Sequence, residues 1–342
     1  MRHRGITEAI RLDGARQIRA LSLLSGGLDS RLAVILLREQ SVDVHGVVFD
    51  SPFFDAEKGK AAAEELGVPV HVIDFSGDIV ALLKNPPHGF GACMNPCVDC
   101  HMRMLARTGE LMEELGFDFV STGEVLNQRP MSQNRQSLEI VAGQSGYGDL
   151  VLRPLSARLM PETRPEREGW VDRSRLLAIE GRSRRRQMEL AERYGLSNYP
   201  TPAGGCLLTE PGFCKRLRDL KDHEGLNGVR SLNLLRFGRH FRLSDSVKMI
   251  VGRNEKDNAY LEGNAELYDL LIKVEGFPGP TGLLPLVAGQ DSITLGAAIC
   301  ARYSDAPKDR QVEVEVRIRS ARGIQKIRVV PAEPASVDQL RI

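Results

Sequence analysis

The most constraining feature of this sequence is the hexapeptide Ser25-Gly-Gly-Leu-Asp-Ser30, which stands between an apolar run and a helical pattern. The run Arg19–Leu24 predicts a strand, and Leu28–Glu39 predicts a helix. Two glycines let the backbone approach a ligand closely, and a helix N-terminus offers free N–H groups at the positive end of its dipole. Ser25 and Ser30 add hydroxyl groups. We call this segment the phosphate loop, because it predicts a phosphate or pyrophosphate site.

Two widespread phosphate motifs are excluded. No Gly-Lys-Ser or Gly-Lys-Thr follows the glycines, so the segment is not a Walker A loop. Its spacing is not that of the dinucleotide-binding fingerprint either. The alternative that needs no ligand is an ordinary glycine-rich turn with a Ser or Asp helix cap.

The first 150 residues alternate short apolar runs with helical patterns. Further strands are expected at 44–49, 70–75 and 117–121, and further helices at 55–66 and 97–115. This alternation predicts an α/β fold with a doubly wound parallel sheet and helices on both faces. Beyond it, Pro154–Pro165 has the composition of a connector, and Arg173–Ile179 and Ser183–Tyr194 have helical patterns. Tyr199–Gly205 predicts a loop.

The last third of the chain has a different pattern. Val312–Ile318 and Ile324–Val330 alternate with period two around a turn signal at Gly323, which predicts a smaller β-rich or α+β domain. We expect the tail, Pro331–Ile342, to be mobile. The expected division is 1–165 for the nucleotide domain, 166–225 for a basic helical connector, and 226–342 for the C-terminal domain.

Composition narrows the class of protein. Hydrophobic residues are 42% and charged residues 27% of the 342 residues, which excludes disorder, collagen and coiled coil as overall descriptions. No apolar run is long enough to span a bilayer, and the basic N-terminus lacks the apolar segment of a signal peptide. Six cysteines in a chain of this size do not form a secreted disulfide framework. We therefore expect a cytoplasmic protein without membrane partners.

The net charge of +1 conceals an uneven distribution. Residues 1–150 sum to −6, residues 151–250 to +8, and residues 251–342 to −1. The basic middle third is either a set of solvated helix faces or a surface for a polyanion. If 183–194 is helical, Arg182, Arg185 and Arg186 fall near one face, and a second basic cluster, 215–221, follows.

The phosphate loop at the end of the first strand resembles the PP-loop ATP pyrophosphatases, which activate a carbonyl oxygen with ATP. The resemblance implies that Ser25, Gly26, Gly27, Asp29 and Ser30 hold the ATP phosphates. It also implies that Asp29 lies close to Mg²⁺. The segment Phe49-Asp-Ser51, at the end of the second strand, would border the adenosine.

A second block resembles tRNA 4-thiouridine synthases within that family. It comprises Ser121-Thr-Gly-Glu-Val-Leu-Asn-Gln128, Met131-Ser-Gln133 and Leu152-Arg-Pro-Leu155. The resemblance places Gly123 beside the nucleotide, and Arg129 or Arg153 could face phosphate. The family's usual charged helix start after Arg-Pro-Leu is replaced here by Ser156–Pro165, so the basic catalytic residue is not assigned.

The cysteines provide the other strong signal. Cys97-Val-Asp-Cys100 leads into a predicted helix, which brings two sulfurs near one point and predicts lowered thiol pKa values. Two incidental buried thiols, a thioredoxin-like pair and a zinc site remain open as interpretations. Zinc would need four ligands, and the candidates to complete the pair are Cys93, His101 and the distant Cys206.

Asn95-Pro-Cys-x-x-Cys100 with a distal Cys206 in a Gly-rich loop resembles PP-loop tRNA thiolases. That resemblance implies that Cys97, Cys100 and Cys206 hold a 4Fe-4S cluster, with zinc as the alternative metal. It also leaves open a persulfide relay between Cys100 and Cys206. The expected catalytic residues are then Asp29, Cys100 and Cys206. Cys214 and Cys300 are expected in the core.

The C-terminal segment resembles the NFACT-R type of RNA-binding domain. The resemblance rests on Phe241-Arg-Leu, Val251-Gly-Arg-Asn254, Asp257-Asn258 and Leu261. It implies tRNA contacts by Arg253 and Asn254, whereas a turn stabilised by Asn and Gly is the structural alternative. Four histidines show no ligand spacing: His71, His88, His101 and His240.

The resemblances together imply ATP-dependent tRNA thiolation, in which the carbonyl oxygen of a uridine or cytidine is adenylated and then replaced by sulfur. ATP and Mg²⁺ are the implied cofactors, and tRNA and a sulfur donor, either sulfide or a persulfide carrier, are the implied partners. The alternative is a PP-loop ligase or amidotransferase-like enzyme acting on a small molecule, with a structural zinc site. A non-catalytic RNA-binding adaptor is disfavoured by the intact phosphate loop.

Overall fold

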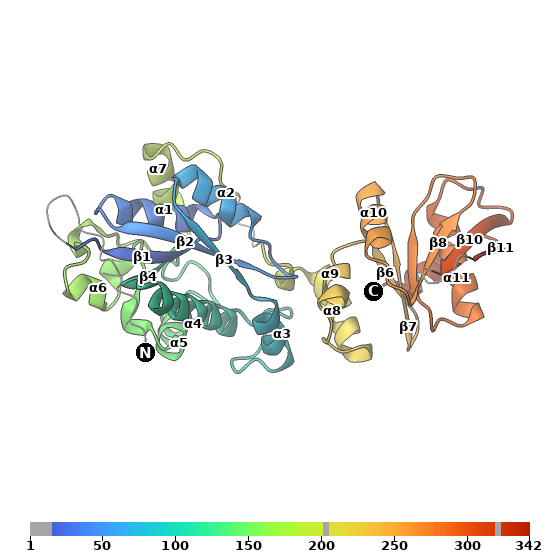
Figure 1. Cartoon of the computed structure of the whole chain (residues 1–342), viewed down its shortest axis with the longest axis horizontal. Helices are drawn as coiled ribbons and strands as arrows, with labels where there is room; N and C mark the ends of the chain where they lie inside the picture. Colours follow the sequence, from blue (N-terminus) through green and yellow to red (C-terminus); the bar gives the residue numbers. More distant parts are fainter. Residues whose placement is uncertain (1–15, 201–204, 319–322) are drawn as a thin grey trace, which may run out of the picture. The chain divides into compact units, whose positions relative to one another are not determined.

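The computed structural model describes residues 16–200, 205–318 and 323–342, and it divides the chain into two compact units (Figure 1). Unit 1 is Met1–Cys206 and unit 2 is Leu207–Ile342. This division differs from the three segments expected from the sequence. Most of the expected loop Tyr199–Gly205, at positions 201–204, lies outside the described residues.

Unit 1 is built on a five-stranded parallel sheet. Its strands are β1 (Arg19–Leu23), β2 (Asp43–Asp50), β3 (Val70–Asp74), β4 (Phe119–Thr122) and β5 (Val151–Leu152). The order is β3-β2-β1-β4-β5, and every neighbouring pair is parallel. Figure 1 shows α1 and α2 on one side of this sheet and α4 and α5 on the other. The expected doubly wound α/β fold is confirmed.

The helices of unit 1 follow the strands. They are α1 (Leu28–Arg38), α2 (Glu57–Leu66), α3 (Ser76–Lys84), α4 (Cys97–Leu115), α5 (Arg135–Ser145), α6 (Arg164–Arg167) and α7 (Arg185–Arg193), with 3-10 turns at Gly148–Leu150, Ala157–Leu159 and Arg173–Arg175. Gly67 and Gly116 end α2 and α4 in the left-handed conformation, where glycine has no steric cost. These ends agree with the sequence prediction.

The segment between β5 and α7 is not a loose connector. Leu155, Val171, Leu176 and Ile179 are buried in the cores of unit 1. The helix predicted over Arg173–Ile179 is wrong, because only a single 3-10 turn forms there before the chain becomes extended. Burial of these apolar side chains explains why this stretch belongs to unit 1.

Unit 2 contains a six-stranded antiparallel sheet with helices, which confirms the expected α+β domain. The strands are β6 (Arg239–Ser244), β7 (Val247–Val251), β8 (Asp269–Val274), β9 (Gly282–Pro285), β10 (Val312–Ile318) and β11 (Ile324–Val329), in the order β11-β10-β8-β9-β7-β6. The helices are α8 (Pro211–His223), α9 (Val229–Leu234), α10 (Glu255–Gly263), α11 (Gln290–Tyr303) and α12 (Pro334–Leu340), with a 3-10 turn at Leu207–Thr209.

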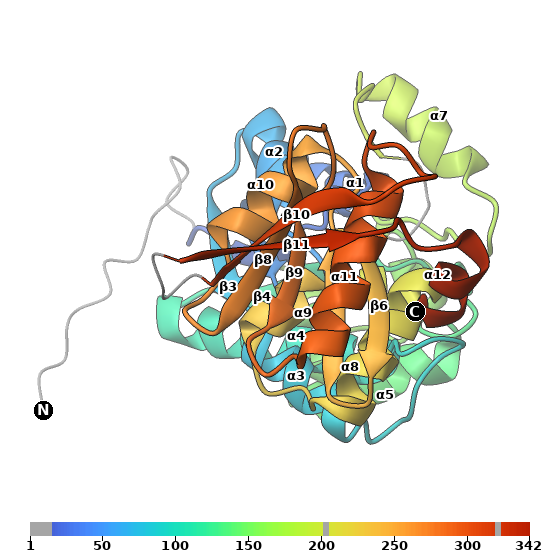
Figure 2. The ribbon, with the colours of Figure 1, turned by 90° about the vertical axis from the view of Figure 1, so that its right-hand side faces the viewer.

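The tail of unit 2 is ordered, so the expectation of mobility is wrong. It forms α12, which buries Val337, and the Ile342 amide donates a hydrogen bond to the His240 carbonyl over 3.0 Å. Figure 2 shows α12 near β6, and α11 lying along the sheet. The apolar side chain and the backbone bond together hold the tail against the domain.

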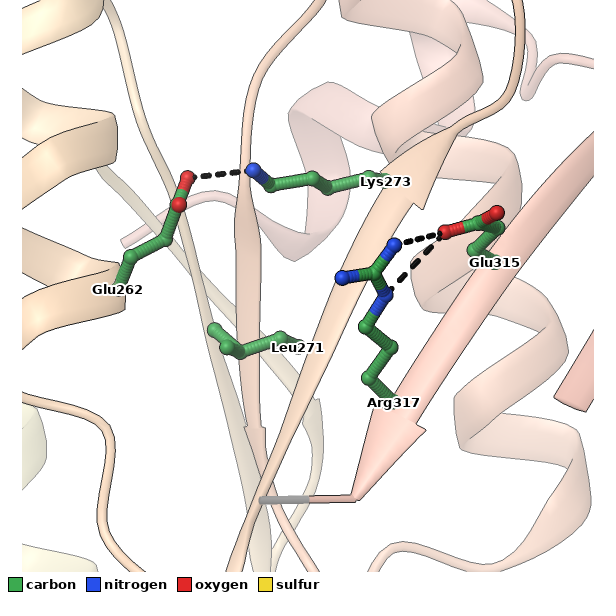
Figure 3. Close-up of a pocket in the computed structure, with 5 residues that line it drawn as sticks. All are labelled: Glu262, Leu271, Lys273, Glu315 and Arg317. Atoms are coloured by element: carbon green, nitrogen blue, oxygen red, sulfur yellow. Dashed lines mark hydrogen bonds and ion pairs between the residues drawn. The ribbon is translucent and has the colours of Figure 1, made fainter. Parts of the chain in front are cut away.

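Unit 2 also has a small hollow of about 50 Å³ between α10, β8 and β10 (Figure 3). Its charged side chains pair with one another: Lys273 with Glu262, and Arg317 with Glu315, each over 2.7 Å. Leu271 completes the lining. Because these charges already have partners, the hollow does not indicate a ligand.

Among the described residues, no helix has the length and apolar character needed to cross a membrane.

Candidate functional site

The candidate site lies at the carboxyl end of the central strand of unit 1. The last residue of β1, Leu23, pairs with Thr122 of β4 and with Val47 of β2. The strand order reverses direction between β1 and β4, and ligands of open α/β sheets bind at such a switch point. The phosphate loop follows β1, and the loop that contains Gly123 follows β4.

The phosphate loop presents the N-terminus of α1 without a side-chain cap. Gly27 is the N-cap residue, and among the described residues no side-chain hydrogen bond caps the helix, which leaves its first amides available to an anion. The Ser30 hydroxyl donates to the Gly27 carbonyl over 2.9 Å, and its oxygen is 3.4 Å from the Ser25 hydroxyl oxygen. The loop is therefore shaped by its own serines.

Two glycines are required by close backbone contacts. Gly26 has a φ of +79°, and a Cβ there would lie 2.4 Å from the Lys58 carbonyl oxygen. A Cβ on Gly123 would lie 2.5 Å from the Ser30 amide nitrogen. Neither backbone contact can be relieved by moving a flexible side chain. The loop after β4 thus rests directly on the first turn of α1.

Asp29 projects from the first turn of α1 into a polar network. Its Oδ2 accepts a hydrogen bond from Gln128 Nε2 over 2.7 Å, and Gln128 Oε1 accepts from Gln187 Nε2 over 2.9 Å. Its Oδ1 is buried and has no hydrogen-bond partner among the described residues, and Arg184 Nη2 lies 3.8 Å away. One carboxylate oxygen is therefore fixed by a hydrogen bond, and the other is held only by the long ion pair with Arg184.

Phe49 stands near the end of β2 and is largely buried. Its ring packs edge to face against Phe75, with ring centroids 5.4 Å apart. Phe49 is therefore held as a rigid apolar wall at the same edge of the sheet as the phosphate loop.

The cysteine pair lies at the start of α4. Cys97 is its first residue and Cys100 follows one turn later, and Asn95 Nδ2 lies 3.1 Å from Cys97 Sγ as a donor. Asp99 between them is fully buried and accepts hydrogen bonds from both His88 Nδ1 and the His88 amide, over 2.6 Å and 3.1 Å. This bonding fixes the preceding loop to the helix start.

The expectation of a lowered thiol pKa is wrong for Cys100. Burial of the sulfur raises its pKa well above the usual value, and the neighbouring Cys206, Cys97 and Asp99 raise it further. These effects outweigh the helix dipole. The same electrostatic influence shows that Cys97, Cys100 and Cys206 lie near one another in unit 1.

Lys58 connects the region of Cys206 with the phosphate loop. Its carbonyl abuts Gly26, and its Nζ would be 3.7 Å from a Cβ on Gly205, the residue before Cys206. Lys58 side-chain and backbone atoms thus lie next to both segments. No sequence signal marks Lys58, because nothing in its local pattern distinguishes it from a surface lysine.

Glu124 lies next to Gly123, which contacts the phosphate loop, and its carboxylate reaches the helix that carries the cysteines. Its Oε1 is 3.0 Å from Nδ1 of His101, the neighbour of Cys100, and its Oε2 accepts from Arg153 Nε over 2.9 Å. Burial raises the pKa of Glu124, but Arg153 and the hydrogen bond with His101 outweigh it and lower the pKa to about 2. Arg153 is held in this buried ion pair, which favours a structural role for Arg153 over a phosphate contact.

No group of three His, Cys, Asp or Glu side chains in the described part of the chain is arranged to hold a single metal ion. The 4Fe-4S cluster expected on Cys97, Cys100 and Cys206, and the alternative zinc site, are therefore not shown by the described residues. Cys214 and Cys300 are buried in the core of unit 2, as expected.

The basic cluster is arranged differently from the prediction. Helix α7 begins at Arg185, so Arg182 lies outside it and the expected common face with Arg185 and Arg186 does not form. Arg185 and Arg186 are exposed and pair with Glu189 over 3.1 Å and 3.2 Å. Arg184, which the sequence analysis did not single out, instead approaches Asp29.

In unit 2, the residues expected to contact RNA have structural partners. The Asn254 side chain caps α10 by accepting from the Asp257 amide over 2.9 Å. Arg253 Nε donates to Asp257 Oδ2 over 2.6 Å, although the arginine remains partly exposed. The turn-stabilising interpretation therefore applies to Asn254.

Comparison with known families matches each unit separately. Residues 18–149 match the tRNA methyl transferase HUP domain, and residues 238–341 match the NFACT protein RNA binding domain. The chain resembles the PP-loop tRNA thiouridine synthases. Both resemblances expected from the sequence are confirmed, and the phosphate loop corresponds to the PP-loop.

Curated relatives carry thiouridylase names. The tRNA-specific 2-thiouridylase MnmA 1 of Syntrophus aciditrophicus is 24% identical, over 92% of this chain and 82% of the relative. The MnmA of Cutibacterium acnes is 32% identical, but over only 31% of this chain and 34% of the relative. A crystal structure of a 4-thiouridine synthetase–RNA complex with bound ATP is 24% identical, covering 41% of this chain and 37% of that chain, with a TM-score of 0.35.

Proposed function

We propose that this protein is an ATP-dependent tRNA thiolation enzyme that replaces a carbonyl oxygen of uridine, or of cytidine, with sulfur. The observation that carries the proposal is that a PP-loop and a set of cysteines flank one strand end of unit 1. Gly123 and Glu124 connect α1 with α4, and Lys58 connects the PP-loop with the segment of Cys206. The names of the relatives support this reaction class.

The PP-loop would bind ATP for the first step. The N-terminus of α1 and the polar groups of Ser25, Gly26, Gly27 and Ser30 suit the phosphates. The unpartnered Oδ1 of Asp29 is the kind of hard oxygen ligand that Mg²⁺ prefers. Phe49 and Gly123 would border the nucleotide. The base carbonyl oxygen attacks the α-phosphorus, and the bond to pyrophosphate breaks as pyrophosphate leaves.

The cysteines would serve the second step. A sulfur nucleophile attacks the activated carbon of the base, and AMP leaves with the former carbonyl oxygen. The grouping of Cys97, Cys100 and Cys206 suits a 4Fe-4S cluster, since each thiolate binds a different iron and the sulfurs need not meet around one ion. When bound, such a cluster supplies an iron on which sulfide can be carried. A persulfide relay between Cys100 and Cys206 uses the same proximity.

Unit 2 would recognise the tRNA. Residues 238–341 match an RNA-binding domain, and residues 207–250 at the start of unit 2 carry a net charge of +4 (9 Lys and Arg against 5 Asp and Glu). A basic surface gives salt-dependent attraction to the phosphate backbone and little discrimination between sequences. The substrate specificity would then come from unit 1, where the base must reach the PP-loop.

The first test is the substitution Asp29→Ala, measured as AMP and pyrophosphate released from ATP in the presence of bulk tRNA. We expect release to fall by about 10²-fold or more, since a group that positions the phosphates is lost. The affinity for tRNA, measured by retention of the complex on a filter, should stay unchanged. Glu64→Ala, an exposed carboxylate on α2, is the matched control and should retain release. Equal AMP release by Asp29→Ala and the wild type would refute the assignment.

A further inference from the structure

Arg184 is oriented differently from the arginines that follow it. Its side chain is 16% exposed, and its Nη2 lies 3.8 Å from Asp29 Oδ1, within ion-pair range but beyond a hydrogen bond. Within the described residues, its Nε is buried without a hydrogen-bond partner, and so is Asp29 Oδ1. Arg184 and Asp29 thus form a long ion pair beside the PP-loop, and each keeps a buried polar atom that makes no hydrogen bond to the described residues.

The position of Arg184 is fixed by the packing of α7. Leu190 and Ala191 are buried in a cluster with Leu28 and Leu32 of α1. Gln187 is completely buried and donates to Gln128, which in turn donates to Asp29. Helix α7 is therefore anchored to the PP-loop side of α1 by both apolar and polar contacts. Arg184 immediately precedes this anchored helix, so its backbone has little freedom to withdraw.

The unpartnered Nε of Arg184 needs an acceptor oxygen, whereas the unpartnered Oδ1 of Asp29 needs a donor or a cation. A buried polar group without a partner destabilises the protein, so such groups are uncommon unless they serve a site. A guanidinium binds phosphate with two parallel hydrogen bonds, which the ammonium of lysine cannot reproduce. A polyphosphate at the N-terminus of α1 would supply the missing acceptor for Arg184.

We propose that Arg184 contacts the phosphates of the nucleotide and stabilises the charge that develops during adenylation. The inference rests on the proposed function, because it requires ATP at the PP-loop. As the bond between the base oxygen and the α-phosphorus forms, the bond from that phosphorus to pyrophosphate breaks, and the leaving pyrophosphate takes the electron pair. The Arg184 guanidinium neutralises this negative charge without giving up a proton, since arginine stays protonated.

The experiment compares Arg184→Gln and Arg184→Lys with the full-length wild type. Affinity for Mg·ATP is measured by calorimetry without tRNA, and AMP formation is then measured with bulk tRNA. We expect Arg184→Gln to weaken ATP binding about tenfold or to slow AMP formation about 10²-fold, with Arg184→Lys intermediate. Arg193→Gln, an exposed arginine in the last turn of the same helix, should match the wild type.

The outcomes separate the two proposals. If the wild type binds ATP and forms AMP while both Arg184 variants match it, the role of Arg184 is refuted and the proposed function stands. If the wild type neither binds ATP nor forms AMP, the proposed function itself fails. Thermal unfolding checks that the variants fold, and Arg184→Lys keeps the test decisive should Arg184→Gln be unstable, because it retains the charge beside Asp29.

Discussion

At the scale of single residues, Gly123 determines whether the loop after β4 can rest on α1. The space for a side chain at this position is taken by the backbone of Asp29 and Ser30. The sequence resemblance pointed to Gly123 as a neighbour of the nucleotide, but it did not show the backbone contact. That contact explains physically why a glycine is required there.

We predict that Gly123→Ala destabilises unit 1 and weakens ATP binding. A Cβ there would force the two loops apart, at a cost of about 1–3 kcal/mol in the free energy of unfolding. Chemical denaturation measures the first effect and calorimetry with Mg·ATP the second. The matched control is Gly143→Ala in α5, where a Cβ meets no atom within 4 Å and the helix should gain about 0.5–1 kcal/mol. Equal stability of both variants would contradict the steric argument.

At the scale of elements, Glu124 joins three parts of unit 1 through one carboxylate. Glu124 lies two positions after β4. Its carboxylate bonds to His101 of α4 and to Arg153, which directly follows β5. Both Glu124 and Arg153 are largely buried, with side chains 10% and 5% exposed. Removing one charge from such a pair leaves the other buried without compensation.

We predict that Glu124→Gln lowers the free energy of unfolding by about 3 kcal/mol at neutral pH. The folded pKa of Glu124 is lowered from 4.5 to about 2, so its contribution to stability is complete above pH 4.5 and is lost as the pH falls toward 2. The difference between wild type and variant should therefore shrink between pH 5 and pH 2. Denaturant titrations across this range measure it. Glu189→Gln, an exposed ion-pair partner, should show a small and nearly constant difference.

The cysteines at the start of α4, together with Cys206, lead to a separate prediction about bound iron. After anaerobic reconstitution, we expect a brown protein with about four irons per chain, and Cys97→Ala, Cys100→Ala and Cys206→Ala should each lose most of that iron. Cys93→Ala, outside the helix, should retain it. A colourless wild type that holds one zinc would contradict the cluster and favour the ligase alternative.

At the scale of the whole molecule, the sequence predicted the parallel sheet of unit 1 well. Short apolar strands and glycine-terminated helices are local signals, so the bounds of β1, α1 and α4 were nearly correct. Two predictions about loops were wrong, and both relied on prolines as signs of a loose chain. Pro154–Pro165 was interpreted as a connector although its neighbours are buried, and the tail after Pro331 was expected to be mobile although it forms α12.

The candidate site was predictable only in part, because local sequence signals do not show contacts between distant residues. Motifs identified the PP-loop and the cysteines because each lies within a few consecutive residues. The contacts between Arg184 and Asp29, and between Glu124 and His101, join residues far apart in the chain. No local pattern distinguishes these side chains from surface charges, so only the packing of α7 and α4 against the loops reveals them.

The most direct test of the account is nucleoside mass spectrometry of tRNA after incubation with the reconstituted protein, ATP, Mg²⁺ and sulfide. The account predicts a thiolated pyrimidine with the wild type, none without ATP, and none with Asp29→Ala. A thiolated nucleoside formed equally without ATP, or no thiolated nucleoside with a wild type that binds both ATP and tRNA, would contradict it.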